Sequence, residues 1–110
     1  MSSNLEIDCQ TLKSMLDDGA DFLLLDCREQ DEHATARIEA ATLLPMSEIQ
    51  ERVSELEPHR ERSIVVHCHH GGRSVRVAMW LRQQGDMQAV SLAGGIDAWS
   101  LTIDPSVPRY

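Results

Sequence analysis

The segment from Cys68 to Ser74 combines a cysteine with groups that stabilise negative charge. Gly71 and Gly72 let the backbone turn sharply and direct its N–H groups inward. Ser74 stands where we expect the N-cap of a helix, and the first N–H groups and the dipole of a helix also attract anions. Such a cradle favours the thiolate, the nucleophilic form of cysteine. We therefore predict that Cys68 is a catalytic nucleophile.

The residues around this cysteine suit an anionic substrate. Arg73 can present a fork of donors to an anion or point into solvent, and we predict the first. We expect His69 and His70 to line the mouth of the site and to contact the donor or the acceptor. A free cysteine and a glycine turn each occur without any catalytic role, but their combination favours a reactive thiol.

The histidines beside the cysteine also raise the question of a metal. Residues 67 to 70 read His-Cys-His-His, and these side chains can bind zinc or copper. Neighbouring residues of a strand point to opposite faces, however, and metal motifs usually space their ligands by about two to four residues. We predict no metal ion and no organic cofactor.

The elements that position the cysteine alternate between strand and helix. Apolar or β-branched runs predict strands at 22–25, 41–44, 64–66 and 89–92, with a short lead at 5–7. Helical spacing of apolar residues predicts helices from Asp8 to near Gly19, from Ser47 to Leu56 and from Ser74 to near Gly85, and a short helix after Gly95. This alternation predicts an α/β fold of three layers, with a mainly parallel sheet of about five strands flanked by helices.

Polar residues follow the strand at 22–25. The carboxyl ends of parallel strands meet at one edge of the sheet, so we expect Asp26 and Arg28 at the rim of the cysteine site. Such a pair more often braces a loop than takes part in catalysis. Cys27 is expected to be a packed thiol, with a role as resolving partner of Cys68 as the alternative.

The segment from Cys68 to Ser74 resembles the active-site loop of the rhodanese (thiosulfate sulfurtransferase) family. Residues 24–29 resemble its D-x-R-E signature, residues 45–48 a later strand-to-helix segment, and residues 92–99 its L-x-G-G-x-x-A-W motif. These matches cover nearly the whole chain, as in the single-domain form of the family. The family often has G-H-I-P-G-A where this chain has residues 36–41, Ala-Arg-Ile-Glu-Ala-Ala. We expect the Ala36 to Ala41 connection to take a different path and to alter one wall of the pocket.

The resemblance implies a sulfurtransferase. Cys68 would take a sulfane sulfur from a small anionic donor, thiosulfate or another persulfide-level compound, and hold it as a persulfide. Cyanide, a thiol or a protein acceptor would then remove it, with loop residues 69–74 binding the substrate. A protein-to-protein sulfur relay or binding module is the alternative.

A cysteine phosphatase is a less favoured third class. The phosphatase motif H-C-x-x-G-x-x-R places one more residue between cysteine and arginine than the four that separate Cys68 from Arg73. Ser74 occupies the place of the phosphatase arginine. The shorter loop predicts a smaller cradle, which suits a sulfur atom better than a phosphoryl group.

Length and charge bound the remaining functions. A chain of 110 residues predicts one domain, residues 1–110, with residues 102–110 as a loose tail. The net charge of −8 argues against nucleic acid and acidic membrane as partners. The three cysteines lack C-x-x-C spacing and follow no signal peptide, and no apolar run approaches the roughly 20 residues that cross a bilayer. These features predict a cytoplasmic protein.

Overall fold

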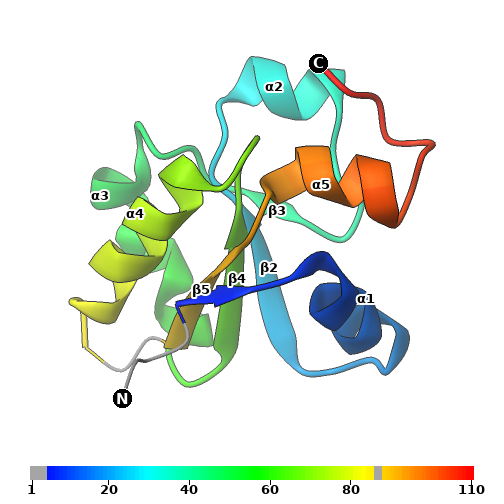
Figure 1. Ribbon diagram of the computed structural model, residues 1–110. Coiled ribbons are helices and arrows are strands. Elements are labelled where there is room, and N and C mark those ends of the chain that lie inside the picture. The colour runs from blue at the N-terminus through cyan, green and yellow to red at the C-terminus, as the bar shows by residue number, and fades with distance from the viewer. Residues whose placement is uncertain (1–4, 86–87) are drawn as a thin grey trace.

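The computed structural model describes residues 5–85 and 88–110 (Figure 1). Its sheet has the strand order β1-β5-β4-β2-β3, and all neighbouring strands are parallel. The strands are β1 (Glu6–Ile7), β2 (Phe22–Asp26), β3 (Thr42–Leu43), β4 (Ser63–His67) and β5 (Gln88–Leu92). The helices are α1 (Cys9–Asp17), α2 (Gln30–Thr35), α3 (Ile49–Arg52), the 3-10 helix η1 (Val53–His59), α4 (Gly72–Arg82) and α5 (Gly95–Thr102). The predicted three-layer α/β fold is confirmed.

Two apolar layers cover the sheet, one on each face. On one face, side chains of α3, η1 and α4 pack against alternate residues of β2 and β4, including Leu23, Leu25, Ile64 and Val66. On the other face, α1 and α5 cover the intervening residues, including Leu24 and Val65. Figure 1 shows α2 beyond the carboxyl ends of the strands, beside the loop that leads into α4. The central strands therefore read as continuous apolar runs because both of their faces are buried.

The register between β2 and β4 fixes which residues meet at the end of the sheet. Leu23 lies opposite Ile64, Leu25 opposite Val66, and Asp26 opposite His67. The residues that follow Asp26 and His67 leave the sheet at the same edge. Polar and reactive side chains after the two strands are thereby brought side by side.

Local sequence signals predicted one helix end correctly and another incorrectly. Asp8 caps α1 as predicted, accepting a hydrogen bond from the Thr11 N–H at 2.8 Å. The helix predicted from Ser47 to Leu56 is instead a short α3 continued by η1. Ser47 does not cap it, because its hydroxyl donates to Glu29 Oε1 at 2.7 Å.

The final segment is held against the domain, whereas the sequence predicted a loose tail for residues 102–110. Val107 is buried in the layer beneath α5, and Ser100 Oγ donates to its carbonyl at 2.6 Å. Arg109 pairs with Asp97 at 2.9 Å. The proline-rich composition of this segment did not reveal these contacts because they depend on how the segment folds back against α5.

The Ala36 to Ala41 connection between α2 and β3 contains no glycine and needs none. Among the described residues, positive φ occurs only at glycines outside this connection. Ala36 and Ile38 are buried, and the connection lines a groove of about 500 Å³ with Trp99 and the final segment. Ile38 thus anchors the connection in the same apolar layer as Trp99.

Within residues 5–85 and 88–110, no helix is long and apolar enough to span a membrane.

Candidate active site

The backbone after β4 surrounds the sulfur of Cys68 with N–H donors. The Gly71 N–H lies 3.0 Å from Cys68 Sγ, and the Ser74 N–H lies 3.3 Å from it. Gly71 has φ of +112°, and a Cβ there would lie 3.3 Å from the Gly94 nitrogen, so glycine suits this position on two counts. Residues 68–71, here called the cysteine loop, therefore curl around the sulfur and lead into α4.

The helix that closes this cradle begins earlier than the sequence predicted. α4 starts at Gly72 with Gly71 in the N-cap position, so Ser74 lies within its first turn. The N-cap prediction for Ser74 was wrong. Its hydroxyl instead joins a buried network: it lies 2.6 Å from Ser91 Oγ, donates to the Gly71 carbonyl at 3.2 Å and accepts from Cys68 Sγ at 3.4 Å.

Cys68 is buried, with 1% of its surface exposed. Its sulfur nevertheless faces the N–H donors of the cradle. A buried polar cradle provides hydrogen bonds that are stronger than in water, because little solvent competes for the donors. The site can therefore hold a negative sulfur.

The start of α5 fixes the cysteine loop from the other side. The Ile96 N–H donates to the Cys68 carbonyl at 2.9 Å, and the Asp97 N–H donates to the His69 carbonyl at 3.1 Å. Gly95, with φ of +61°, lies so close that a Cβ would overlap both of these carbonyl groups. The L-x-G-G segment is thus a structural support for the cysteine loop.

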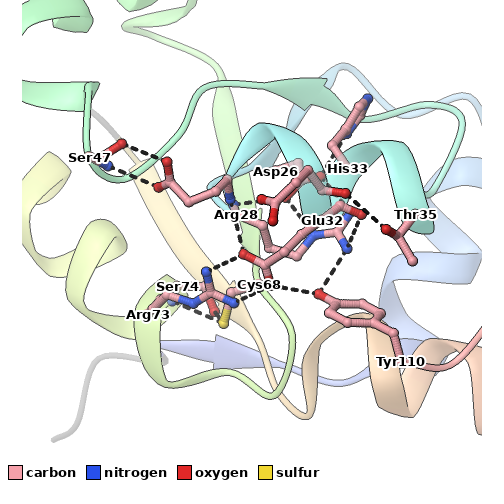
Figure 2. Close-up of polar contacts among 12 residues, drawn as sticks. Asp26, Arg28, Glu32, His33, Thr35, Ser47, Cys68, Arg73, Ser74 and Tyr110 are labelled. Atoms are coloured by element: carbon pink, nitrogen blue, oxygen red, sulfur yellow. Dashed lines mark hydrogen bonds and ion pairs between the residues drawn. The ribbon is translucent and has the colours of Figure 1, made fainter.

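Arg73 is already paired with a carboxylate. Its guanidinium makes two hydrogen bonds to Glu32 of α2, at 2.7 and 2.8 Å (Figure 2). These bonds lower the pKa of Glu32 to about 2 and raise the pKa of Arg73. Both groups stay charged at neutral pH. The sequence had offered an anionic substrate or solvent as the partner of Arg73, and Glu32 was missed.

The side chain of Tyr110 lies over the same region. Its hydroxyl donates to Glu32 Oε2 at 2.8 Å and accepts from Arg28 Nη1 at 3.0 Å (Figure 2). Its ring stacks on His69, with ring centroids 3.9 Å apart. His70 stacks in turn against His69. Both histidines therefore lie at the outer side of the cysteine loop, and His69 contacts the final segment through Tyr110.

Asp26 and Arg28 lie beneath the rim rather than at it. Both are fully buried, and Asp26 accepts from Arg28 Nε at 2.9 Å and from Nη2 at 2.8 Å. Burial alone would raise the pKa of Asp26, but Arg28, His67 and His33 outweigh it, so the pKa is lowered. Arg28 also donates to the carbonyls of Glu32 and Ala36. These contacts fit the loop-bracing role that the sequence analysis considered for Asp26 and Arg28.

The histidines around Cys68 are divided between separate environments. His67 is fully buried, and its Nε2 lies 3.9 Å from Asp26 Oδ2. Burial lowers the pKa of His67 to about 4, so the ring is neutral at pH 7. His69 and His70 lie outside this buried network. In the described part of the chain, no group of three or more His, Cys, Asp or Glu side chains could hold a metal ion.

The structure thus assembles some predicted residues around the sulfur and separates others. Cys68, Gly71 and Ser74 form the cradle, while Gly72 opens α4. Sequence reasoning missed Glu32, Tyr110 and Ser91. The capping box between Glu29 and Glu32 marked the start of α2, but no local signal indicated the pairing with Arg73 or the return of Tyr110.

The fold and this site define a class: a small parallel α/β domain with a cysteine cradled at the carboxyl end of its central strand. The profile of the Rhodanese-like domain family matches residues 8–102. The chain belongs to this family.

Individual relatives agree with this assignment. A sulfurtransferase of Allochromatium vinosum is 40% identical over 95 residues, which are 86% of this chain and 87% of that protein. The maize "Adenylyltransferase and sulfurtransferase MOCS3-1" is 31% identical over 115 residues, and this chain spans about a quarter of its length. A rhodanese-related protein of Thermoplasma volcanium superposes with a TM-score of 0.81 at 30% identity, covering 96% of this chain and 98% of that one. Family membership supports sulfur transfer as the general function.

Proposed function

We propose that the protein is a sulfurtransferase that carries a sulfane sulfur on Cys68. The observation that carries this proposal is the pair of N–H groups, from Gly71 and Ser74, that face the sulfur of Cys68 at 3.0 and 3.3 Å. The same donors suit a thiolate before the reaction and a persulfide after it. The names of the relatives, among them the Allochromatium vinosum sulfurtransferase, support the same chemistry.

The first half-reaction loads the cysteine. The Cys68 thiolate attacks the outer sulfur of thiosulfate and forms a new S–S bond. The original S–S bond of thiosulfate breaks, and sulfite leaves with the electron pair. Cys68 then carries an anionic persulfide, which the cradle stabilises.

The second half-reaction removes the sulfane sulfur from Cys68. A thiophilic acceptor, such as cyanide or a thiol, attacks the terminal sulfur and releases the Cys68 thiolate. No proton transfer is needed when the acceptor is an anion. We therefore assign Cys68 as the catalytic residue and the N–H groups of residues 71 and 74 as the binding groups for its negative charge.

A protein-to-protein relay is the second candidate, and the pairing of Arg73 with Glu32 favours it. The carboxylate offsets the guanidinium charge, which weakens attraction for thiosulfate, a dianion. A donor of lower charge, such as a persulfide on another protein, is affected less. The maize relatives are composite proteins of which this chain matches about a quarter, an arrangement in which a rhodanese-like domain is joined to other parts.

Intact-mass spectrometry after incubation with thiosulfate tests the proposal. We expect the wild type to gain the mass of one sulfur atom, and Cys68→Ala to gain none. Cys9→Ala removes a buried cysteine away from the cradle and should load like the wild type. Absence of a sulfur adduct on the wild type, or equal loading of Cys68→Ala, would refute the assignment.

Turnover measurements then separate the classes of function. A sulfurtransferase that uses small molecules converts thiosulfate and cyanide to thiocyanate, whereas a dedicated relay loads but turns over little with cyanide. An aryl phosphate assayed in parallel tests the phosphatase class. We expect no phosphate release, because the guanidinium of Arg73 faces Glu32.

A further inference from the structure

Cys27 lies beside Cys68 at the carboxyl edge of the sheet. Asp26 is opposite His67 in the parallel register, and the Cys27 N–H donates to the His67 carbonyl at 3.1 Å. In a parallel pair, a residue whose N–H bonds to one residue of the neighbouring strand lies opposite the next residue. This hydrogen bond therefore extends the register by one step and sets Cys27 opposite Cys68.

Both side chains point to the same face of the sheet. Leu23, Leu25 and Cys27 alternate along one strand, and Ile64, Val66 and Cys68 alternate along its neighbour. All six side chains belong to the apolar layer beneath α4. Opposed residues of neighbouring strands have backbones about 4.8 Å apart, within the range of about 4.4–6.8 Å between the Cα atoms of disulfide-bonded cysteines. The spacing of the two strands therefore meets the Cα condition for a disulfide between Cys27 and Cys68.

We propose that Cys27 is a resolving cysteine that forms a disulfide with Cys68 when the persulfide finds no acceptor. This inference rests on the proposed function, because the persulfide on Cys68 supplies the oxidising sulfur. The Cys27 sulfur attacks Cys68 Sγ, and a bond forms between the two sulfurs of the protein. The bond between Cys68 Sγ and the sulfane sulfur breaks, and that sulfur leaves with the electron pair.

The reaction balances without an external oxidant. The sulfane sulfur is reduced to sulfide, while the two cysteine sulfurs are oxidised to a disulfide. The proton of the Cys27 thiol is taken up by the leaving sulfur, which departs as hydrosulfide. The only reactants are the persulfide and the neighbouring thiol.

The surroundings of Cys27 make this reaction slower than transfer to an acceptor. Cys27 is fully buried, and burial, together with the charge of Cys68, raises the pKa of its thiol. Little of it is therefore thiolate at neutral pH, and the thiolate is the attacking form. The persulfide stays available while an acceptor is present, and the disulfide protects Cys68 from further oxidation once the acceptor is exhausted.

The test follows thiosulfate-loaded protein after the donor has been removed and no acceptor has been added. We expect the wild type to lose the added sulfur over minutes to hours. It should release one equivalent of hydrosulfide and end two hydrogen atoms lighter than the reduced protein. Cys27→Ala should keep its persulfide and form no such species. Cys9→Ala, the matched control, should behave like the wild type.

Peptide mapping makes the test independent of the variants. Trypsin under non-reducing conditions should yield the peptide that ends at Arg28 joined to the peptide that ends at Arg73. A wild-type persulfide as long-lived as that of Cys27→Ala, or a disulfide that involves Cys9, would overturn the inference and leave the proposed function intact. Failure of the wild type to take up sulfur at all would overturn the proposed function, and the resolving role would fall with it.

Discussion

Replacing Glu32 by glutamine should make the protein a better acceptor of sulfur from thiosulfate. The change removes one negative charge from the side chain that pairs with Arg73. Glutamine keeps the size of the side chain and an amide oxygen. That oxygen can still accept from the Glu29 N–H at the start of α2, as Glu32 Oε1 does at 3.1 Å. The helix is therefore preserved while the charge at the site becomes more positive.

The exposure of the pair sets the size of the effect. Two unit charges at contact distance interact by about 1 kcal/mol in water and by about 4 kcal/mol at an effective dielectric constant of about 20. The side chains of Arg73 and Glu32 are 35% and 19% exposed, which favours the lower part of this range. Since about 1.4 kcal/mol corresponds to a tenfold change, we expect the KM for thiosulfate to fall by roughly five- to tenfold.

Steady-state formation of thiocyanate from thiosulfate and cyanide measures this change. The gain should shrink as ionic strength rises, because salt screens partly exposed charges. Glu57→Gln is the control, since it removes the same charge from exposed Glu57 of η1, which pairs with Arg60. A KM for Glu32→Gln that is unchanged or higher than that of the wild type, in correctly folded protein, would refute the electrostatic reasoning.

Three further substitutions test the supports of the site. His67→Phe should flatten the pH dependence of stability. Folding lowers the pKa of His67 to about 4, so the wild type should lose about 3 kcal/mol of unfolding free energy as the pH falls from 6.5 to 4. Urea denaturation at several pH values measures this loss, and an equal loss in His67→Phe would contradict the prediction. Ser74→Ala should lower the unfolding free energy by about 1–3 kcal/mol, since the buried Ser91 hydroxyl loses a hydrogen-bond partner. The variant should still load sulfur, because the backbone N–H of residue 74 is retained. Loss of loading in folded protein would contradict this. Gly95→Ala should cost at least about 2 kcal/mol, because the residue has positive φ and its Cβ would overlap the cysteine loop, and an unchanged melting temperature would argue against that packing.

The fold and the cradle could be predicted because their signals are local. Continuous apolar runs marked β2 and β4, whose two faces are both covered, and Asp8 marked the start of α1. The order of cysteine and glycines after a strand indicated N–H donors around Cys68, and two such donors are found. Each inference used residues within one turn or one strand of each other.

The surroundings of the cradle could not be predicted in the same way. Arg73 and Glu32 are 41 residues apart, and Tyr110 and Glu32 are 78 apart, so their pairing depends on how α2 and the final segment pack. Ser74 had the residue type of an N-cap, but glycine in the left-handed conformation at residue 71 begins the helix instead. At this helix start, the tight turn at Gly71 determines the N-cap, and the N-cap preference of serine does not.

The hydrogen bonds from the first turn of α5 to the carbonyls of Cys68 and His69 bear on how this chemistry could be engineered. The cysteine loop does not keep its shape alone, because a segment more than twenty positions later holds it from behind. Grafting residues 68–74 onto another protein would leave those two carbonyls without their donors. A transplant that keeps the arrangement must include both the cysteine loop and the first turn of α5. The smallest portable unit is therefore the ends of β4 and β5 with the helices that follow them, α4 and α5.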